Sequence, residues 1–299
     1  MVAATRGLDR GRTDQGAVDA AYRADLARWI DVQQKAALDF FSDGLLRWQD
    51  LFRPLVAGLG PEPHTLVRWL DTNTFYREPE FPQGISRASS TIAALPDASV
   101  PQPRVITLPS PYVFSRVAKS AARDQLMSPL ASNVLRPVID TAVRGGTRLI
   151  HLEEPWLAYE GIEDASWSAF SEALEILHRG VNATLALHIY FGNAAPHIAR
   201  LKQLPVDALG IDLVQTDVAA LGRGWDKGLI AGLVNGRVSR LESLDGLVTA
   251  AQLLADQVKP RDLYLTSNTE LSYLPTRVAE QKVERLGQAA DRLKELVSV

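Results

Sequence analysis

The sequence predicts an α/β protein, a single-domain (β/α)8 TIM barrel, and three observations lead to that fold class. Short apolar or β-branched runs alternate with longer amphipathic stretches, as strands and helices do in a parallel sheet. Eight such runs can be counted, and eight strands close a barrel. Most of the runs end in polar residues, and in this class of barrel the active site lies at the carboxyl ends of the strands.

The predicted elements follow from the apolar periodicity. In chain order, the strands are expected at residues 2–5, 38–42, 104–108, 147–152, 183–189, 208–213, 229–234 and 262–266. The amphipathic stretches predict helices at 17–37, 129–143, 166–178, 241–258 and 275–299. Pro275 opens the last helix, where a missing N–H costs nothing, and an apolar stripe along that helix predicts packing against the barrel.

One segment, residues 60–103, does not fit the alternation of strands and helices. It is rich in Pro and contains the extended-looking stretch VRWLDTNTFYREPEFP. We expect it to form an inserted excursion over the barrel mouth, within one domain that spans residues 1–299.

Composition favours small-molecule chemistry. The net charge is −3, from 32 basic and 35 acidic residues that are mixed along the chain, so neither nucleic acid nor a solvated tail is indicated. No apolar run approaches the roughly 18 residues of a membrane span, and the N-terminal stretch lacks the apolar centre of a secretory signal. We expect a cytoplasmic protein with a small-molecule substrate and no membrane partner. The absence of cysteine excludes disulfides, thiolate nucleophiles and Cys-ligated zinc.

Polar side chains end six of the eight predicted strands. They are Ser42 and Asp43, Glu153 and Glu154, His188, Asp212, Asn235, and the group Asn268, Thr269 and Glu270. Each has a simple structural explanation when taken alone, because a strand-end His is more often a hydrogen-bonded core residue and Asn-Gly is typical of a turn. Parallel strands bring their ends together, so the set predicts a ligand pocket.

Seven stretches resemble, in order and spacing, motifs of the cobalamin-independent methionine synthases. They are AALDFFSDGLLRWQDLF, RWLDTNTFYREP, LPSPYVFSRVA, LIHLEEPWL, LALHIYFGN, GLIAGLVNGRVSRLES and LYLTSNTELSYLP. The resemblance is to the catalytic C-terminal domain of that family and to its short, single-domain archaeal-type members. It implies a TIM barrel of the methionine synthase and uroporphyrinogen decarboxylase type.

The resemblance also identifies what this chain lacks. Family members hold zinc with one His, one Glu and two Cys, and the metal activates the thiol of homocysteine. His188 matches the His and Asp212 stands for the Glu, but the two Cys positions are Tyr190 and Thr269. Without sulfur ligands a tight tetrahedral zinc site is not expected.

Residues that contact substrate in the family differ as well. Leu45 replaces the Glu that receives the amine of homocysteine, Glu153 replaces an Asp, and Asn235 replaces another Asp. Glu154 and Glu242 match the family pattern. These changes argue against methionine synthesis by attack of a zinc-bound thiolate.

The leading hypothesis is a divergent transferase of this family. It would transfer a methyl or alkyl group, or make or break a related bond, on a small polar substrate at the barrel mouth, with a methyl donor or partner protein as a further partner. The expected catalytic residues are His188, Tyr190, Asp212, Glu153 and Glu154. The expected substrate-binding residues are Arg47, Asn73, Tyr76, Asn235, Glu242, Asn268 and Thr269.

Three alternatives concern the chemistry of the pocket. His188, Asp212 and Glu270 would form a hard ligand set for iron, manganese or a weakly held zinc. A metal-free acid-base lyase or decarboxylase would use Tyr190 as proton donor and His188 as acceptor, for which uroporphyrinogen decarboxylase is an analogy at the level of the fold. The third alternative is a non-catalytic binding or partner subunit that kept the fold.

Overall fold

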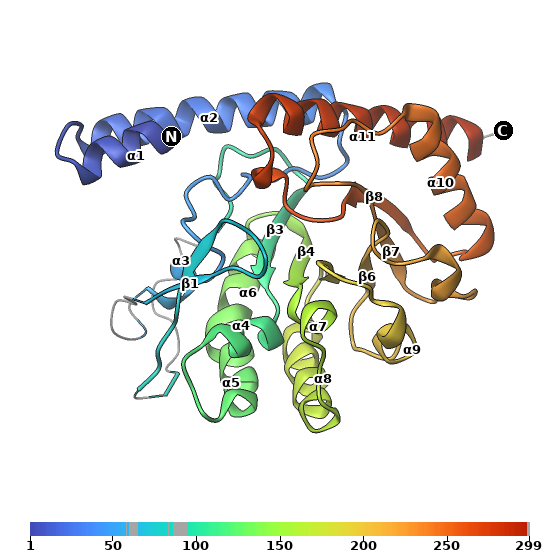
Figure 1. The fold of residues 1–299 in the computed structure, drawn as a ribbon, viewed down its shortest axis with the longest axis horizontal. Helices are drawn as coiled ribbons and strands as arrows, with labels where there is room; N and C mark the ends of the chain where they lie inside the picture. Colours follow the sequence, from blue (N-terminus) through green and yellow to red (C-terminus); the bar gives the residue numbers. More distant parts are fainter. Residues whose placement is uncertain (58, 60–64, 83, 86–94, 298–299) are drawn as a thin grey trace.

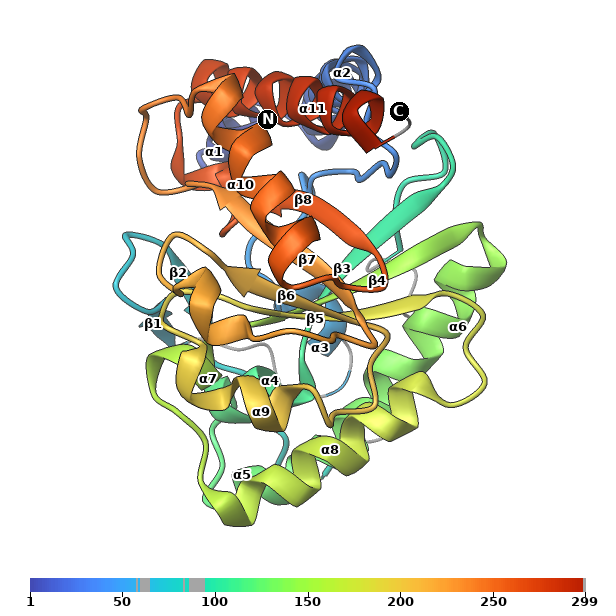
Figure 2. The same ribbon diagram turned by 90° about the vertical axis from the view of Figure 1, so that its right-hand side faces the viewer.

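A curled parallel sheet of six strands forms the centre of the molecule. The structure, a computed structural model, describes residues 1–57, 59, 65–82, 84–85 and 95–297. The strands follow one another along the sheet in chain order. They are β3 (Arg104–Pro109), β4 (Thr147–Glu154), β5 (Thr184–Ile189), β6 (Ala208–Asp212), β7 (Gly228–Val234) and β8 (Leu263–Ser267). Figures 1 and 2 show helices packed on the outer side of this curl.

Helical segments connect each strand to the next, as a parallel sheet requires. β3 is followed by α4 (Pro111–Val117), α5 (Arg123–Pro129), the π-helical η2 (Leu130–Leu135) and α6 (Arg136–Arg144). β4 is followed by α7 (Trp156–Tyr159) and α8 (Asp164–His178), and β5 by η3 (Ala195–His197) and α9 (Ile198–Leu201). The later connections are η4 (Val218–Leu221), α10 (Leu244–Gln257) and, after β8, η5 (Leu271–Tyr273) and α11 (Thr276–Val297).

Two long helices from opposite ends of the chain lie side by side. They are α2 (Gln15–Lys35), which α1 (Val2–Asp9) precedes, and α11 (Figures 1 and 2). A Cβ atom on Gly287 of α11 would overlap the carbonyl oxygen of Ala36, so this contact requires a residue without a side chain. Both helices contribute side chains to the wall of the barrel interior.

Two of the eight predicted strands were wrong. Residues 2–5 lie in α1, where two alanines favour a helix that packs on α2. Residues 38–42 form only one parallel bridge, between Phe41 and Arg104. The side-chain amide of Gln33 accepts a hydrogen bond from the N–H of Ser42 and donates one to its carbonyl. It therefore satisfies the two backbone groups that would otherwise bond to a neighbouring strand. The other six strands are confirmed to within two residues at each end.

A small antiparallel hairpin lies ahead of the sheet in sequence. It consists of β1 (Leu66–Arg68) and β2 (Phe75–Arg77), and the short helix α3 (Arg53–Val56) precedes it. The predicted excursion at 60–103 contains this hairpin, and residues 60–64, 83 and 86–94 of that segment lie outside the described residues. Within the described part of the chain, no helix combines the length and the apolarity needed to cross a bilayer.

Candidate functional site

A cavity of about 990 Å³ occupies the interior of the curled sheet and reaches the carboxyl ends of the strands. Leu149 and Ile230, near the amino ends of β4 and β7, line it, and so do Tyr190 and Glu270, which follow the carboxyl ends of β5 and β8. Tyr76 of the β1–β2 hairpin lines it as well. This volume is at the upper end of the range that small-molecule sites occupy.

The alternation of side chains along β4 and β5 places four polar groups in this cavity. Residues two apart share a face of a strand, so His151 and Glu153 of β4 point inward together, as do His188 of β5 and Tyr190, which directly follows that strand. Glu153 pairs in register with His188, which sets these two side chains next to each other. On the next strand the partner of His188 is Gly210, where a Cβ atom would lie only 2.5 Å from Cγ of His188. Gly210 therefore makes room for the imidazole ring.

The two histidines form a buried pair. Nε2 of His151 lies 3.0 Å from Nδ1 of His188, at hydrogen-bonding distance. Burial lowers the pKa of His151 to about 4 and places the pKa of His188 well below its ordinary value, the latter with a further contribution from the charge of His151. Both rings are therefore neutral near pH 7. Nε2 of His188 is buried and has no hydrogen-bond partner.

A second cluster connects two carboxyl groups through a tyrosine. The hydroxyl of Tyr190 lies 2.9 Å from Oε2 of Glu153 and 3.0 Å from Oε1 of Glu270. Burial, followed by the charge of Glu270, raises the pKa of Glu153 well above its ordinary range. Tyr190 can donate only one proton, so the second hydrogen bond requires a protonated carboxyl, and Glu153 is the carboxyl that holds that proton. Thr269 and Tyr273 also hydrogen-bond Glu270.

The proposed metal ligands do not form a cage. Oδ1 of Asp212 accepts hydrogen bonds from the N–H groups of Val214 and Gln215 and from the side-chain amide of Asn268. Across the described residues, no three His, Asp or Glu side chains come together as a metal-binding group. The zinc that the family resemblance implies therefore does not fit this donor set.

Glu154 points away from the cavity, because it occupies the opposite face of β4 from Glu153. It is fully buried and accepts hydrogen bonds from the hydroxyl of Ser110 and from the N–H groups of Val113 and Leu157. Burial raises its pKa to about 7. Glu154 thus stabilises the first turns of α4 and α7.

Of the remaining residues predicted to bind substrate, some line the cavity and the others contact protein groups elsewhere. Tyr76 and Thr269 line the cavity. Glu242 forms an ion pair with the buried ammonium of Lys282 at 2.9 Å and accepts from the N–H of Asn235. Arg47 lies with its guanidinium 3.9 Å from the ring centre of Tyr22. Two further residues hydrogen-bond outside the cavity wall, Asn73 with Arg68 and Asn268 with Asp212.

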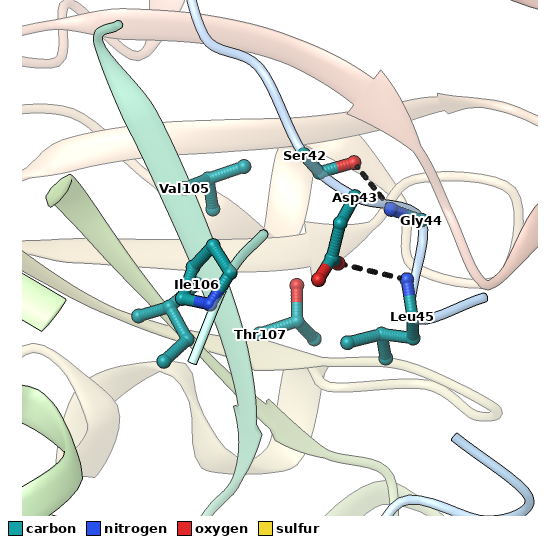
Figure 3. A pocket seen from close by; sticks show the side chains of 8 residues that line it. Ser42, Asp43, Gly44, Leu45, Val105, Ile106 and Thr107 are labelled. Atoms are coloured by element: carbon teal, nitrogen blue, oxygen red, sulfur yellow. Dashed lines mark hydrogen bonds between the residues drawn. The ribbon is translucent and has the colours of Figure 1, made fainter. Parts of the chain in front are cut away.

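A recess of about 40 Å³ lies beside the larger cavity, between the loop of residues 42–45 and β3 (Figure 3). Oδ1 of Asp43 accepts from the N–H of Leu45 at 3.0 Å. Leu45 has a φ of 51°, which is rare for a residue with a side chain. Figure 3 shows the carboxyl of Asp43 pointing toward Thr107. The recess has space for about one water molecule.

Sequence reasoning missed two residues of the site, His151 and Tyr273. His151 precedes Glu153 by two residues and so shares its face of the strand, a signal that the sequence contains. Tyr273, in η5, hydrogen-bonds Glu270. Hydrophobic periodicity does not predict contacts between residues outside the regular helices and strands.

Comparisons with known proteins agree with the fold. The sequence profile described as cobalamin-independent synthase, N-terminal domain, matches residues 60–258. A 5-methyltetrahydropteroyltriglutamate–homocysteine methyltransferase of Herpetosiphon aurantiacus is 28% identical over 251 residues, covering 77% of this chain and 32% of that protein. The enzyme of the same name from Neisseria gonorrhoeae is 31% identical over 226 residues, covering 70% and 28%. The chain thus spans about a third of the length of the curated relatives it matches.

Solved structures extend the likeness over most of the chain. A B12-independent methionine synthase from a Shewanella species, in complex with selenomethionine, has a TM-score of 0.74 at 17% identity and covers 96% of this chain and 92% of its own. A methyltransferase from Methanosarcina mazei has a TM-score of 0.59 at 15% identity, covering 82% and 79%. These likenesses confirm the predicted barrel class. The matched profile is that of an N-terminal domain, whereas the motifs in the sequence resemble the C-terminal domain.

Proposed function

The chain belongs to the cobalamin-independent synthase family, and from that premise we propose that it transfers a methyl or alkyl group to a small polar substrate without cysteine-held zinc. The reaction would take place at the carboxyl ends of the strands, in one barrel domain of residues 1–299. Two relatives are named as methyltransferases that act on homocysteine, which supports the reaction class. The observation that carries the proposal is the unpartnered Nε2 of His188 in the wall of the cavity.

His188 has the position and protonation state of a general base. Its lowered pKa keeps the ring neutral near pH 7, and in the tautomer that donates through Nδ1 to His151 its Nε2 carries the lone pair. An acceptor atom that carries a proton would place that proton on Nε2. The acceptor's electron pair then forms the bond to the methyl carbon, while the electron pair of the broken donor bond stays with the donor.

Mass spectrometry of reaction mixtures tests the proposal directly. The protein is incubated with methyl donors (methyltetrahydropteroylglutamates and a methylated corrinoid protein) and with thiol and amine acceptors. The intact protein is expected to form a methylated product, and His188→Asn is expected to lower the rate by about a hundredfold, as loss of a general base does. His197→Asn on η3 is the matched control and should leave the rate unchanged. Failure to form a methylated product from any pair, or full activity in His188→Asn, would refute the proposal.

A second candidate, a metal-free acid-base lyase or decarboxylase, is favoured by the cluster of Glu153, Tyr190 and Glu270. Tyr190 can deliver its proton to a substrate carbanion and regain one from the protonated carboxyl beside it. Tyr190→Phe separates the two functions. In a lyase this change removes the proton donor and lowers turnover by about a hundredfold or more, whereas methyl transfer with His188 as the base should fall only a few-fold.

A further inference from the structure

The large cavity continues past the end of the sheet. β8 is the last strand and pairs with β7 alone among the strands that the structure describes, so the sheet has a free edge there. All five residues of β8 are only partly buried, whereas all five of β6, inside the sheet, are buried. Both faces of β8 line the cavity, Tyr264 and Thr266 from one face and Leu263 and Leu265 from the other. The cavity therefore passes around this edge and reaches α11.

The part of the cavity between β8 and α11, which we call the inner chamber, has a mainly apolar wall. Side chains from β8, from α11 and from the segment before β3 form it, among them Phe40, Leu265, Val283, Leu286, Ala290 and Leu293. The rings of Phe40 and Tyr264 lie 6.2 Å apart, centre to centre. Such a wall offers a ligand apolar surface and few hydrogen-bonding groups.

The basic side chains that line the cavity have acidic partners within the protein. The pairs are Arg28 with Glu280 at 2.7 Å, Lys282 with Glu242 at 2.9 Å and Lys294 with Asp39 at 3.0 Å. A carboxylate or phosphate on a ligand would have to displace one of these acidic partners. The inner chamber thus favours an apolar group over an anion.

An unpartnered polar atom lies in the wall of the same cavity. His188 is 3% exposed, yet its Nε2 has no hydrogen-bond partner, and leaving such an atom unbonded is costly. The register of the sheet connects His188, through Gly210 and Ile230, with Tyr264 of β8. The polar corner and the strand that borders the inner chamber therefore lie at one level of the sheet.

We propose that the cavity binds an amphipathic molecule, whose hydroxyl or thiol lies in the corner of Glu153, His188 and Tyr190 and whose unbranched apolar chain passes the free edge of β8 into the inner chamber. This inference rests on the proposed function and specifies its substrate class: the polar group that accepts the methyl is one end of a molecule with an apolar chain. A small polar molecule alone would leave much of the 990 Å³ empty.

Titration calorimetry with straight-chain alcohols tests the substrate class without any methyl donor. The probes are 1-butanol, 1-hexanol and 1-octanol. Affinity is expected to rise about three- to fourfold for each added methylene, because each one leaves water for the apolar chamber. In 1,8-octanediol a second hydroxyl sits at the far end of the same chain. It is expected to bind at least about tenfold more weakly than 1-octanol, since that hydroxyl loses its water without gaining a partner.

A variant that narrows the inner chamber locates the chain. Ala290→Phe places a ring in the wall on α11 and should weaken binding of 1-octanol about tenfold or more while changing that of 1-butanol less than threefold. Gln288→Phe adds the same ring on the exposed side of α11 and should leave both affinities unchanged. Thermal unfolding verifies that each variant is folded.

The proposal would be overturned if affinity did not rise from 1-butanol to 1-octanol, if the diol bound as tightly as 1-octanol, or if folded Ala290→Phe bound 1-octanol as the unaltered protein does. The first two comparisons need no variant, so a folding defect cannot obscure them. Methyl transfer to short acceptors without any gain from chain length would refute only this inference. Binding that strengthens with chain length, without methyl transfer, would refute only the proposed function.

Discussion

His151 reaches across from β4 to Nδ1 of His188 on β5, and this contact leaves Nε2 as the ring nitrogen of His188 without a partner. The two rings are tilted at 50° with their centres 5.1 Å apart, so they touch without stacking flat. Since the hydrogen bond occupies Nδ1, the nitrogen that could bond a ligand is the buried Nε2. His151 is thus a positioning residue for His188.

Substitution of His151 should impair activity through the orientation of His188. His151→Leu removes the hydrogen bond and should lower kcat for methyl transfer by about tenfold to a hundredfold, as loss of a residue that orients a catalytic group does. His151→Gln keeps a side chain that can bond Nδ1 and should stay within a few-fold of the unaltered protein. Steady-state kinetics and thermal unfolding of both variants check this. Equal activities in the two variants, at equal stability, would contradict a positioning role.

Gly210 is predicted to be indispensable to this arrangement. In Gly210→Ala the new methyl group would meet the imidazole of His188 at 2.5 Å, so either the ring or the strand must move. We expect a loss of about 1–3 kcal/mol in the free energy of unfolding, typical of overpacking, together with loss of methyl transfer. Chemical denaturation measures the first effect. Gly145→Ala is the control, because its Cβ would meet nothing closer than 3.3 Å, and a loss as large there would refute the steric explanation.

The stability of the fold should depend on pH through Glu154. Its pKa rises by burial from near 4.5 in the unfolded chain to about 7 in the folded protein. Stability from this group is therefore fully present below about pH 4.5 and is lost as the pH rises through about 7, an effect of about 3 kcal/mol. Glu154→Gln removes this titration, so its free energy of unfolding should rise relative to the unaltered protein across that range.

Denaturation curves of both proteins at several pH values test this prediction. The pKa of His151, lowered to about 4, produces the opposite slope, since stability is lost as the pH falls from about 6.5 toward 4. That contribution is present in both proteins and cancels in the difference. A difference that does not change with pH would show that Glu154 does not take up a proton on folding.

Much of the fold could be predicted because local periodicity survives in the structure. Six strands and the long helices were predicted from their apolar repeats. A short, continuous apolar run is typical of a strand buried on both faces of a parallel sheet. The second predicted strand failed because Gln33 satisfies the backbone of Ser42 with its side chain. Here a side chain makes the backbone hydrogen bonds that a neighbouring strand would make. That contact depends on how α2 packs against the segment, and the local sequence pattern does not contain this information.

The candidate site was predictable to a similar degree. Glu153, His188, Tyr190, Thr269 and Glu270 were expected at the strand ends, and all of them line the cavity. Which face a strand-end residue occupies follows from period-two alternation. Which partner it bonds depends on tertiary contacts, and these direct Asp212 to Asn268 and Glu242 to Lys282. Strand-end position therefore identifies candidates but does not assign their roles.

The ion pair between Lys282 and Glu242 allows a test of whether Glu242 has a structural role or binds substrate. The ammonium of Lys282 is fully buried and donates to both carboxylate oxygens of Glu242 and to the carbonyl of Arg240. Lys282→Met should lower the free energy of unfolding by about 3–5 kcal/mol, because it leaves a largely buried carboxylate without its cation. Lys294→Met is the matched control. Its exposed pair with Asp39 should contribute less than about 1 kcal/mol.

Chemical denaturation of both variants decides between a structural and a substrate-binding role for Glu242. If Glu242 mainly supports the loop after β7 through Lys282, then Lys282→Met and Glu242→Gln should destabilise the fold while the KM of the folded fraction stays nearly unchanged. A substrate-binding Glu242 would instead raise KM in Glu242→Gln at little cost in stability. Because Glu242 also accepts from the N–H of Asn235, which ties it to the loop after β7, we expect the first result.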